Sequence, residues 1–147
     1  MGLVLRIKRI RGGTLALPAY HSAGAAGLDL LADIERAIAL APLERCAVLT
    51  GIAVEIPPGY EGQVRPRSGR ALREGLTLLN PPGTIDSDYR GEIQVIMVNL
   101  GREPVSIEPG DRIAQLVIAP VARVELVEVD ELDDTSRGGG GFGHTGR

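Results

Sequence analysis

The chain has 147 residues, a formal net charge of −3 and one cysteine, Cys46. Its length suits a single domain with its own core, and its charge excludes the broad basic field with which proteins hold nucleic acid. One cysteine excludes an internal disulfide and favours a reducing compartment. The N-terminus lacks the apolar stretch of a signal peptide, and no apolar run reaches the roughly 18 residues of a membrane helix. We therefore expect a cytoplasmic protein with neither a nucleic-acid nor a membrane partner.

Strand signals dominate along the chain. Residues 4–10 (VLRIKRI) alternate apolar and basic side chains, and residues 51–56 (GIAVEI) place Ile52, Val54 and Ile56 on one face. Residues 94–98 and 112–121 are apolar runs rich in β-branched side chains. Turn signals with Gly and Pro recur at 12–13, 57–59, 81–83 and 109–110. The pattern predicts an all-β sandwich or barrel with one short helix at 69–75, for which Ser68 is the candidate N-cap.

The C-terminal segment differs from the rest. Residues 135–147 (TSRGGGGFGHTGR) are too glycine-rich to hold a shape alone. The glycine spacing nearly matches a phosphate-binding P-loop, but His144 replaces the lysine and the chain stops where a helix is needed. Phe142 has no core of its own to pack in. This favours an arm that becomes ordered when it contacts another surface. We divide the chain into a β domain, 1–130, and a flexible arm, 131–147.

Two segments could carry chemistry. In PRSGR (66–70), Arg67 and the helix start at Ser68 suit an anion, although a Ser cap beside a solvated arginine is the commoner explanation for this segment taken alone. Residues 83–93 (GTIDSDYRGEI) are typical of a β-hairpin. There Asp86 could orient a water and Tyr89 could pack on a sugar or base, or both could serve the turn locally.

The sequence leaves the roles of two further side chains undecided. Asp29 is either a turn aspartate or an indirect metal ligand, and Gln115 points either to solvent or into a site. The two histidines, His21 and His144, lack metal-ligand spacing.

Five segments together carry a resemblance that none carries alone. AGLDLLA (26–32), PRSGRA (66–71), NPPGTIDSDYRGEI (80–93), GDRIAQL (110–116) and RGGGGFGHTG (137–146) occur in this order. They closely resemble the five ordered motifs of the trimeric dUTPases (deoxyuridine triphosphate nucleotidohydrolases), from about residue 22 to the C-terminus. The departures are Arg70, where the family more often has leucine, and His144, where serine is more frequent.

The resemblance implies a jelly-roll or β-sandwich barrel subunit with one short helix, assembled as a homotrimer with shared active sites. The implied activity converts dUTP and water to dUMP and pyrophosphate, with Mg²⁺ as cofactor, which limits uracil in DNA and supplies dUMP for thymidylate synthesis. Asp86 would activate the water that attacks the α-phosphate, and Asp29 would contact the metal, through water. The implied substrate-binding residues are Arg67, Ser68, Gly69, Asn80, Thr84, Ile85, Tyr89, Gln94, Gln115, Arg137, Phe142, Gly143 and Thr145.

The sequence features bear on three alternative functions. A dCTP deaminase of the same fold needs a carboxylate near the cytosine ring, but the strand after Gly83–Ile93 offers no glutamate. A non-catalytic trimeric binding module leaves the full set of catalytic and phosphate residues without a use. A structural jelly roll leaves the coincidence of PRSG and GTIDSDY unexplained.

Overall fold

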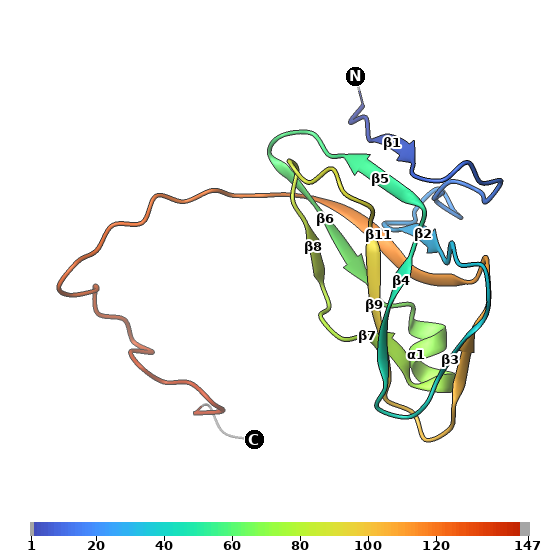
Figure 1. The fold of residues 1–147 in the computed structure, drawn as a ribbon. Helices are drawn as coiled ribbons and strands as arrows, with labels where there is room; N and C mark the ends of the chain where they lie inside the picture. The colour runs from blue at the N-terminus through green and yellow to red at the C-terminus, as the bar shows by residue number, and fades with distance from the viewer. Residues whose placement is uncertain (1, 145–147) are drawn as a thin grey trace.

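The computed structural model describes residues 2–144 and is built almost entirely of antiparallel strands (Figure 1). The strands are β1 (Arg6–Arg9), β2 (Leu28–Leu31), β3 (Ile38–Leu40), β4 (Arg45–Leu49), β5 (Ile52–Glu55), β6 (Tyr60–Arg65), β7 (Leu76–Leu78), β8 (Gly83–Ile85), β9 (Gln94–Asn99), β10 (Val105–Ile107) and β11 (Arg112–Pro120). A short helix, α1 (Ser68–Glu74), follows β6. The predicted all-β fold, a distorted jelly-roll β-sandwich, is confirmed.

The strands form four small sheets. The larger two have the orders β2-β11-β6-β8 and β4-β9-β7, and the pairs β1-β5 and β10-β3 complete the fold. Strand β11 is central because it pairs with β2 on one side and with β6 on the other. This brings segments from the two ends of the chain next to each other and builds one side of the site described below.

The core is made of aliphatic side chains, as the scarcity of aromatics requires. Along β2, Leu28 and Leu30 point inward while their neighbours are half-buried, which is the period of two expected of a strand with one buried face. The buried Asn99 is fully hydrogen-bonded. Its amide donates to the carbonyls of Leu40 and Glu103 (2.9 and 2.8 Å), and its oxygen accepts from the Gly101 N–H (2.8 Å). Because every polar atom of the Asn99 side chain has a hydrogen-bond partner, its burial does not carry the free-energy penalty of an unpaired polar group.

Helix α1 begins one residue earlier than a Ser68 cap would require. Ser68 is the first helical residue, and the N-cap is Arg67, whose side chain makes no capping hydrogen bond. The prediction of Ser68 as N-cap is therefore wrong. Pro66 and Arg67 continue extended from β6, so the helix start is set by the chain direction and not by the serine hydroxyl. The helix ends at Gly75, whose φ of 71° is the left-handed conformation that glycine adopts most easily.

The segment 83–93 is not a β-hairpin, so the hairpin predicted from its sequence is wrong. Strand β8 pairs with β6, whereas β9 pairs with β4 and β7, so the two strands flanking the turn belong to different sheets. The residues between them, 86–93, form a loop that crosses from one sheet to the other, which we call the acidic loop. Its two ends are therefore held by two separate sheets.

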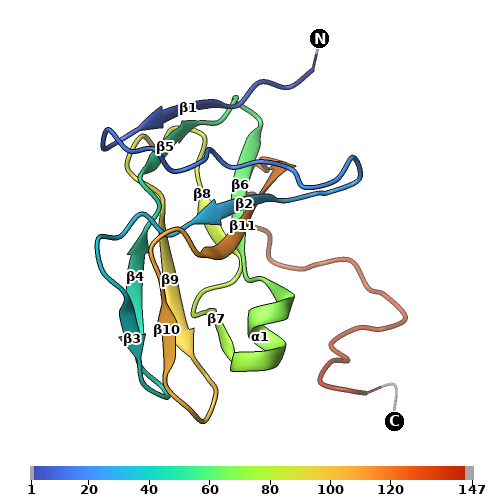
Figure 2. The ribbon, with the colours of Figure 1, turned by 90° about the vertical axis from the view of Figure 1, so that its right-hand side faces the viewer.

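The C-terminal segment leaves the domain after β11. Figures 1 and 2 show it running away from the sheets, and within the described part, residues 121–144, it contains no helix or strand. The division at 130/131 into domain and arm remains a prediction.

Within residues 2–144, the structure contains no helix with the length and apolarity needed to span a membrane.

Candidate active site

The acidic loop forms one wall of a cavity of about 320 Å³. Its lining combines the end of β8, the loop and the start of β9, together with Ala47 of β4. The lining residues are Ala47, Thr84, Ile85, Asp86, Tyr89, Glu92, Gln94 and Ile96. Five of the predicted site residues thus share one cavity: Thr84, Ile85, Asp86, Tyr89 and Gln94.

Asp86 lies between two cavities. It lines the space just described and also a second space of about 780 Å³, which is bordered by Tyr60 and Arg123 as well. Its side chain is exposed, and its carbonyl accepts a hydrogen bond from the Tyr89 N–H (3.1 Å), which closes the turn. The main chain of Asp86 therefore serves the turn while its carboxylate stays accessible to solvent and ligand.

Tyr89 is held at both ends. Its N–H is bonded to Asp86, and its hydroxyl donates to the carbonyl of Glu92 (3.1 Å). The phenol lies so close to Gly91 that a Cβ at that position would collide with the ring. Gly91 is thus needed as the smallest residue, and the ring presents a flat face at the cavity wall.

A second cavity, of about 310 Å³, lies at the start of α1. Three arginines, one carboxylate and three small or polar residues surround it: Asp29, Arg67, Ser68, Gly69, Arg70, Arg73 and Gln115. Five of the seven residues predicted for phosphate or metal contact are here, because β2, β11 and α1 converge at this point; the other two, Arg137 and Thr145, belong to the C-terminal segment.

Asp29 is surrounded by two arginines and a histidine. Its carboxylate lies 3.4 Å from Arg67 Nε, 3.2 Å from His21 Nε2 and 3.7 Å from Arg112 Nε. It is mostly buried, and in the sheet it is paired with Gln115. Arg67 is therefore oriented by Asp29. The alternative that the sequence left open, a simply solvated arginine, does not hold.

Gln115 points into this second cavity, which decides between the two orientations left open above. Its amide donates to the carbonyl of Pro66 (3.2 Å), and its side chain fills the space that a Cβ at Gly27 would take. The glycine of AGLDLLA thus makes room for the glutamine of GDRIAQL across the β2–β11 pair.

Arg70 is anchored within the chain. Its guanidinium donates to Glu74 (2.6 Å), to Asp111 (3.0 Å) and to the Ser106 carbonyl (2.9 Å). Burial opposes its charge, but the hydrogen bonds and the proximity of Glu74 and Asp111 raise the pKa of Arg70 above its ordinary value. It fastens α1 to the β10–β11 turn, so Arg67 and Arg73 remain the more available cations of this cavity.

Four predicted residues lie outside both cavities, and one lies outside the described residues. Asn80 is exposed, with its amide near Gly83. Arg137, Phe142 and Gly143 lie on the C-terminal segment, where Arg137 donates to the Gly140 carbonyl (2.7 Å) and Phe142 is fully exposed. Thr145 lies beyond residue 144, the last that the structure describes.

Two charged lining residues, Glu92 and Arg73, were not among the residues indicated by the sequence. Glu92 borders the acidic-loop cavity, and Arg73 borders the second one, with its guanidinium 3.2 Å from where a Cβ at Gly69 would be. Arg73 follows Gly69 by four residues, so helical spacing could have indicated it. Glu92 stands in the quoted segment, but nothing local shows that its side chain turns toward the site.

The side chains of the second cavity suit a magnesium ion only if an anionic ligand supplies most of its ligand atoms. Among residues 2–144 there is no group of three or more His, Cys, Asp or Glu side chains that could hold a metal. Asp29 is the one carboxylate lining the second cavity, and arginines flank it. Mg²⁺ usually keeps several waters and binds through one or two carboxylates plus substrate phosphates, which suits this arrangement.

The fold and the two cavities define an antiparallel β-sandwich protein with one cavity at the acidic loop and a second, arginine-lined cavity at the start of α1. The dUTPase family profile matches residues 14–146. The chain is 59% identical to the deoxyuridine 5'-triphosphate nucleotidohydrolase of Anaeromyxobacter sp. (strain Fw109-5), with 100% of both chains covered. It is 55% identical to the protein of that name from Caldanaerobacter subterraneus subsp. tengcongensis, with 99% of each covered.

Solved structures agree with this family. A mutant of the Staphylococcus bacteriophage 80alpha dUTPase with dUpNHpp superposes with a TM-score of 0.87 at 27% identity, covering 98% of this chain and 99% of that one. A mutant dUTPase of phage phi11 of S. aureus, described with a structural Mg(II) ion, gives 0.78 at 25% identity, covering 87% and 97%. This chain belongs to the dUTPase family.

Proposed function

We propose that the protein hydrolyses dUTP to dUMP and pyrophosphate. The observation that carries the proposal is the acidic-loop cavity, in which Asp86, Tyr89 and Gln94 face one space in a chain of the dUTPase family. The name deoxyuridine 5'-triphosphate nucleotidohydrolase, borne by relatives that match over the whole chain, supports the substrate.

Asp86 is the general base of this reaction. Its carboxylate, ionised at neutral pH, accepts a proton from a water whose oxygen attacks the α-phosphorus. The bond from that phosphorus to the bridging oxygen breaks, and pyrophosphate leaves with the electron pair. The position of Asp86 between two cavities supports this role, since one cavity is available to the nucleotide and the other to solvent.

The nucleoside binds against the acidic loop. Tyr89 packs on the deoxyribose and leaves no room for a 2′-hydroxyl, while Asn80, Thr84, Ile85 and Gln94 border the uracil. A flexible pocket would reject the thymine methyl by only about 1–3 kcal/mol, so rigid backbone is the better device. The anchoring of the loop in two different sheets supports such rigidity.

The triphosphate binds at the second cavity. Arg67, Ser68, Gly69 and Gln115 contact its oxygens, and Arg73 adds a further charge. Asp29 would hold a magnesium ion through water, and the ion would neutralise phosphate charge. Phosphoryl transfer requires mainly alignment and neutralised charge, which these groups supply without covalent chemistry.

The complete site is shared between chains of a homotrimer. Two observations support this assembly: the two cavities have no lining residue in common, and apolar side chains such as Val124, Leu126 and Leu132 are largely exposed. The arm, 131–147, closes over the nucleotide, with Phe142 and Gly143 at the uracil and Arg137 and Thr145 at the phosphates. Closure expels water and orders the triphosphate.

A substrate panel tests the reaction. The protein is incubated with Mg²⁺ and dUTP, dTTP, dCTP or UTP, and pyrophosphate and ammonia are measured. We expect pyrophosphate from dUTP alone. Ammonia from dCTP would identify a deaminase instead, and binding without either product would identify a non-catalytic module.

A further inference from the structure

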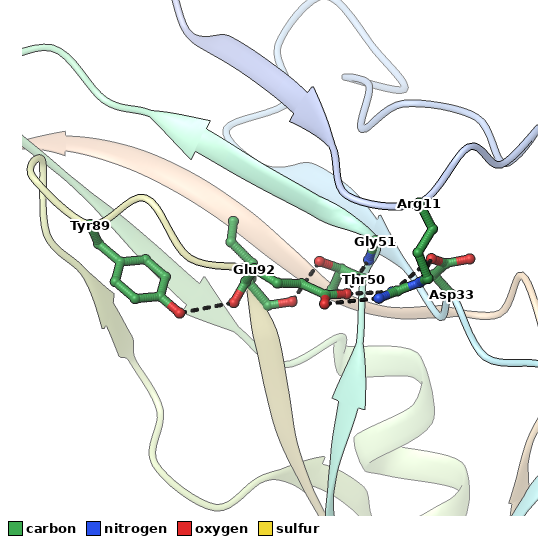
Figure 3. Close-up of polar contacts among 7 residues, drawn as sticks. Arg11, Asp33, Thr50, Gly51, Tyr89 and Glu92 are labelled. Atoms are coloured by element: carbon green, nitrogen blue, oxygen red, sulfur yellow. Dashed lines mark hydrogen bonds and ion pairs between the residues drawn. The ribbon is translucent and has the colours of Figure 1, made fainter.

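Arg11 lies outside the five motifs yet joins two distant parts of the chain. It follows β1 in the N-terminal segment, and its guanidinium donates to two carboxylates at once (Figure 3). Nε and Nη2 donate to Asp33 Oδ2 (3.0 and 2.8 Å), and Nη1 donates to Glu92 Oε2 (3.0 Å), while Nη2 also reaches the other Glu92 oxygen. The fork of an arginine is suited to such a bridge, and a lysine ammonium is not.

Glu92 is fixed by this contact. Its side chain is only 13% exposed, and besides Arg11 it accepts a hydrogen bond from the Gly51 N–H (2.8 Å). The hydrogen bonds from Arg11, opposed by burial and aided by Gly51, hold the pKa of Glu92 below its ordinary value. Glu92 therefore stays ionised with its carboxylate turned toward Arg11.

The other side of Glu92 holds Tyr89. The Glu92 carbonyl accepts the Tyr89 hydroxyl (3.1 Å), and the Tyr89 N–H is bonded to the Asp86 carbonyl. The next residue, Ile93, is held by the Thr50 hydroxyl on its carbonyl (2.6 Å). One continuous set of contacts thus runs from Arg11 through Glu92 to the tyrosine ring, as Figure 3 shows.

We propose that Arg11 is a positioning residue that sets sugar specificity: by binding Glu92 it fixes the acidic loop and with it the place of the Tyr89 ring. The inference rests on the proposed function, because it assumes that Tyr89 meets the deoxyribose. Without Arg11, the Glu92 carboxylate lacks a cationic partner and is freed to move. The Tyr89 hydroxyl then loses a fixed acceptor, and the ring shifts toward positions that admit a ribose.

Three variants test the proposal. Arg11→Ala removes the bridge, and Arg11→Lys keeps the charge but not the fork. Arg6→Ala is the matched control, because Arg6 lies on the same N-terminal segment and its ion pair with Glu55 is largely exposed. For each variant, kcat and KM are measured with dUTP and with UTP well below the melting temperature. Amide hydrogen exchange of residues 86–93 is measured in parallel.

We expect Arg11→Ala to lower kcat/KM for dUTP about tenfold, mainly through KM, because small misplacements of a contact group cost one to two orders of magnitude. The preference for dUTP over UTP should fall, loop exchange should quicken, and Arg11→Lys should be intermediate. Arg6→Ala should match the wild type in all three. In a Glu92→Gln background, Arg11→Ala should have little further effect, since the two residues act as one unit.

The outcomes separate the inference from the function on which it rests. A wild-type protein inactive on dUTP refutes the function, and loop exchange then still tests the contact. An active Arg11→Ala with unchanged dUTP preference and only a lower melting temperature overturns the inference, because stability alone does not alter sugar specificity. If Arg11→Ala does not fold, the Arg11→Lys measurements decide in the same way.

Discussion

At the scale of single residues, the site depends on close approaches as much as on charges. Gly91 allows the Tyr89 phenol to lie against the loop backbone, and Gly27 makes room for Gln115. Neither glycine has an unusual φ, so it is the missing side chain and not backbone freedom that these positions require. Two residues with no reactive group thus set the positions of two residues that contact ligand in the proposed site.

Gly91→Ala tests this reading. The new Cβ would collide with the Tyr89 ring, and the exposed ring is the part that can move. We expect kcat/KM for dUTP to fall by about tenfold or more, because the sugar contact is displaced, with little change in the melting temperature. Steady-state kinetics and a thermal melt measure both. Gly12→Ala is the control, since a Cβ there meets nothing, and a Gly91→Ala enzyme with normal kinetics would refute the reading.

Glu92 makes stability depend on pH in the acidic range. Its pKa in the folded protein lies below the ordinary value of 4.5. Above the ordinary value both states are ionised and the contribution is fully present. As pH falls toward the folded-state pKa, the unfolded chain binds its proton first and stability is lost.

Urea denaturation of the wild type and of Glu92→Gln measures this contribution. The difference between their free energies of unfolding should be constant from pH 8 down to about 5.5 and shrink below pH 4.5 or so, following the ordinary pKa of a glutamate. A difference that grows on acidification would contradict the assigned direction.

At the scale of elements, alternation of apolar residues predicted strands correctly, but not their partners. The runs at 94–98 and 112–121 are β9 and β11. Strand–turn–strand spacing at 83–93 is typical of a hairpin, yet β8 and β9 join different sheets, because pairing is decided by residues distant in sequence. The motif residues were found because five short motifs occur in the order of a known family, although no single motif indicates a site. The Arg11–Glu92 contact was not found, since its members are 81 positions apart.

The arm can be removed without touching the core. The buried core residues all precede residue 117. A chain ending at Asp134 should therefore unfold at the same temperature as the full chain, while kcat/KM for dUTP falls by about a hundredfold or more through loss of site closure. Thermal melts and kinetics on both chains measure this, and retained activity would show that the arm has no part in the reaction.

At the scale of the whole molecule, one chain carries two separate cavities. The acidic-loop cavity and the arginine-lined cavity share no lining residue, and no described residue of the arm lines either of them. In the proposed homotrimer, neighbouring copies bring a base, a flat contact and a phosphate-binding cavity together around one nucleotide. The exposed Val124, Leu126 and Leu132 give such copies an apolar surface to bury.

Sedimentation equilibrium measures the assembly. We expect a single species at three times the 15.5 kDa mass of one chain across the micromolar range. Replacing Leu126 and Leu132 by serine should shift the distribution to smaller species and lower the activity with it. A wild-type chain that sediments as a monomer and is fully active would refute the shared site.

The role of Asp86 is tested most directly by hydrolysis of dUTP in ¹⁸O-labelled water by the wild type and by Asp86→Asn. We expect label in dUMP and none in pyrophosphate for the wild type. Asp86→Asn should lose turnover while its affinity for a non-hydrolysable dUTP analogue stays nearly unchanged. Label in pyrophosphate, or an Asp86→Asn enzyme that turns over at the wild-type rate, would contradict it.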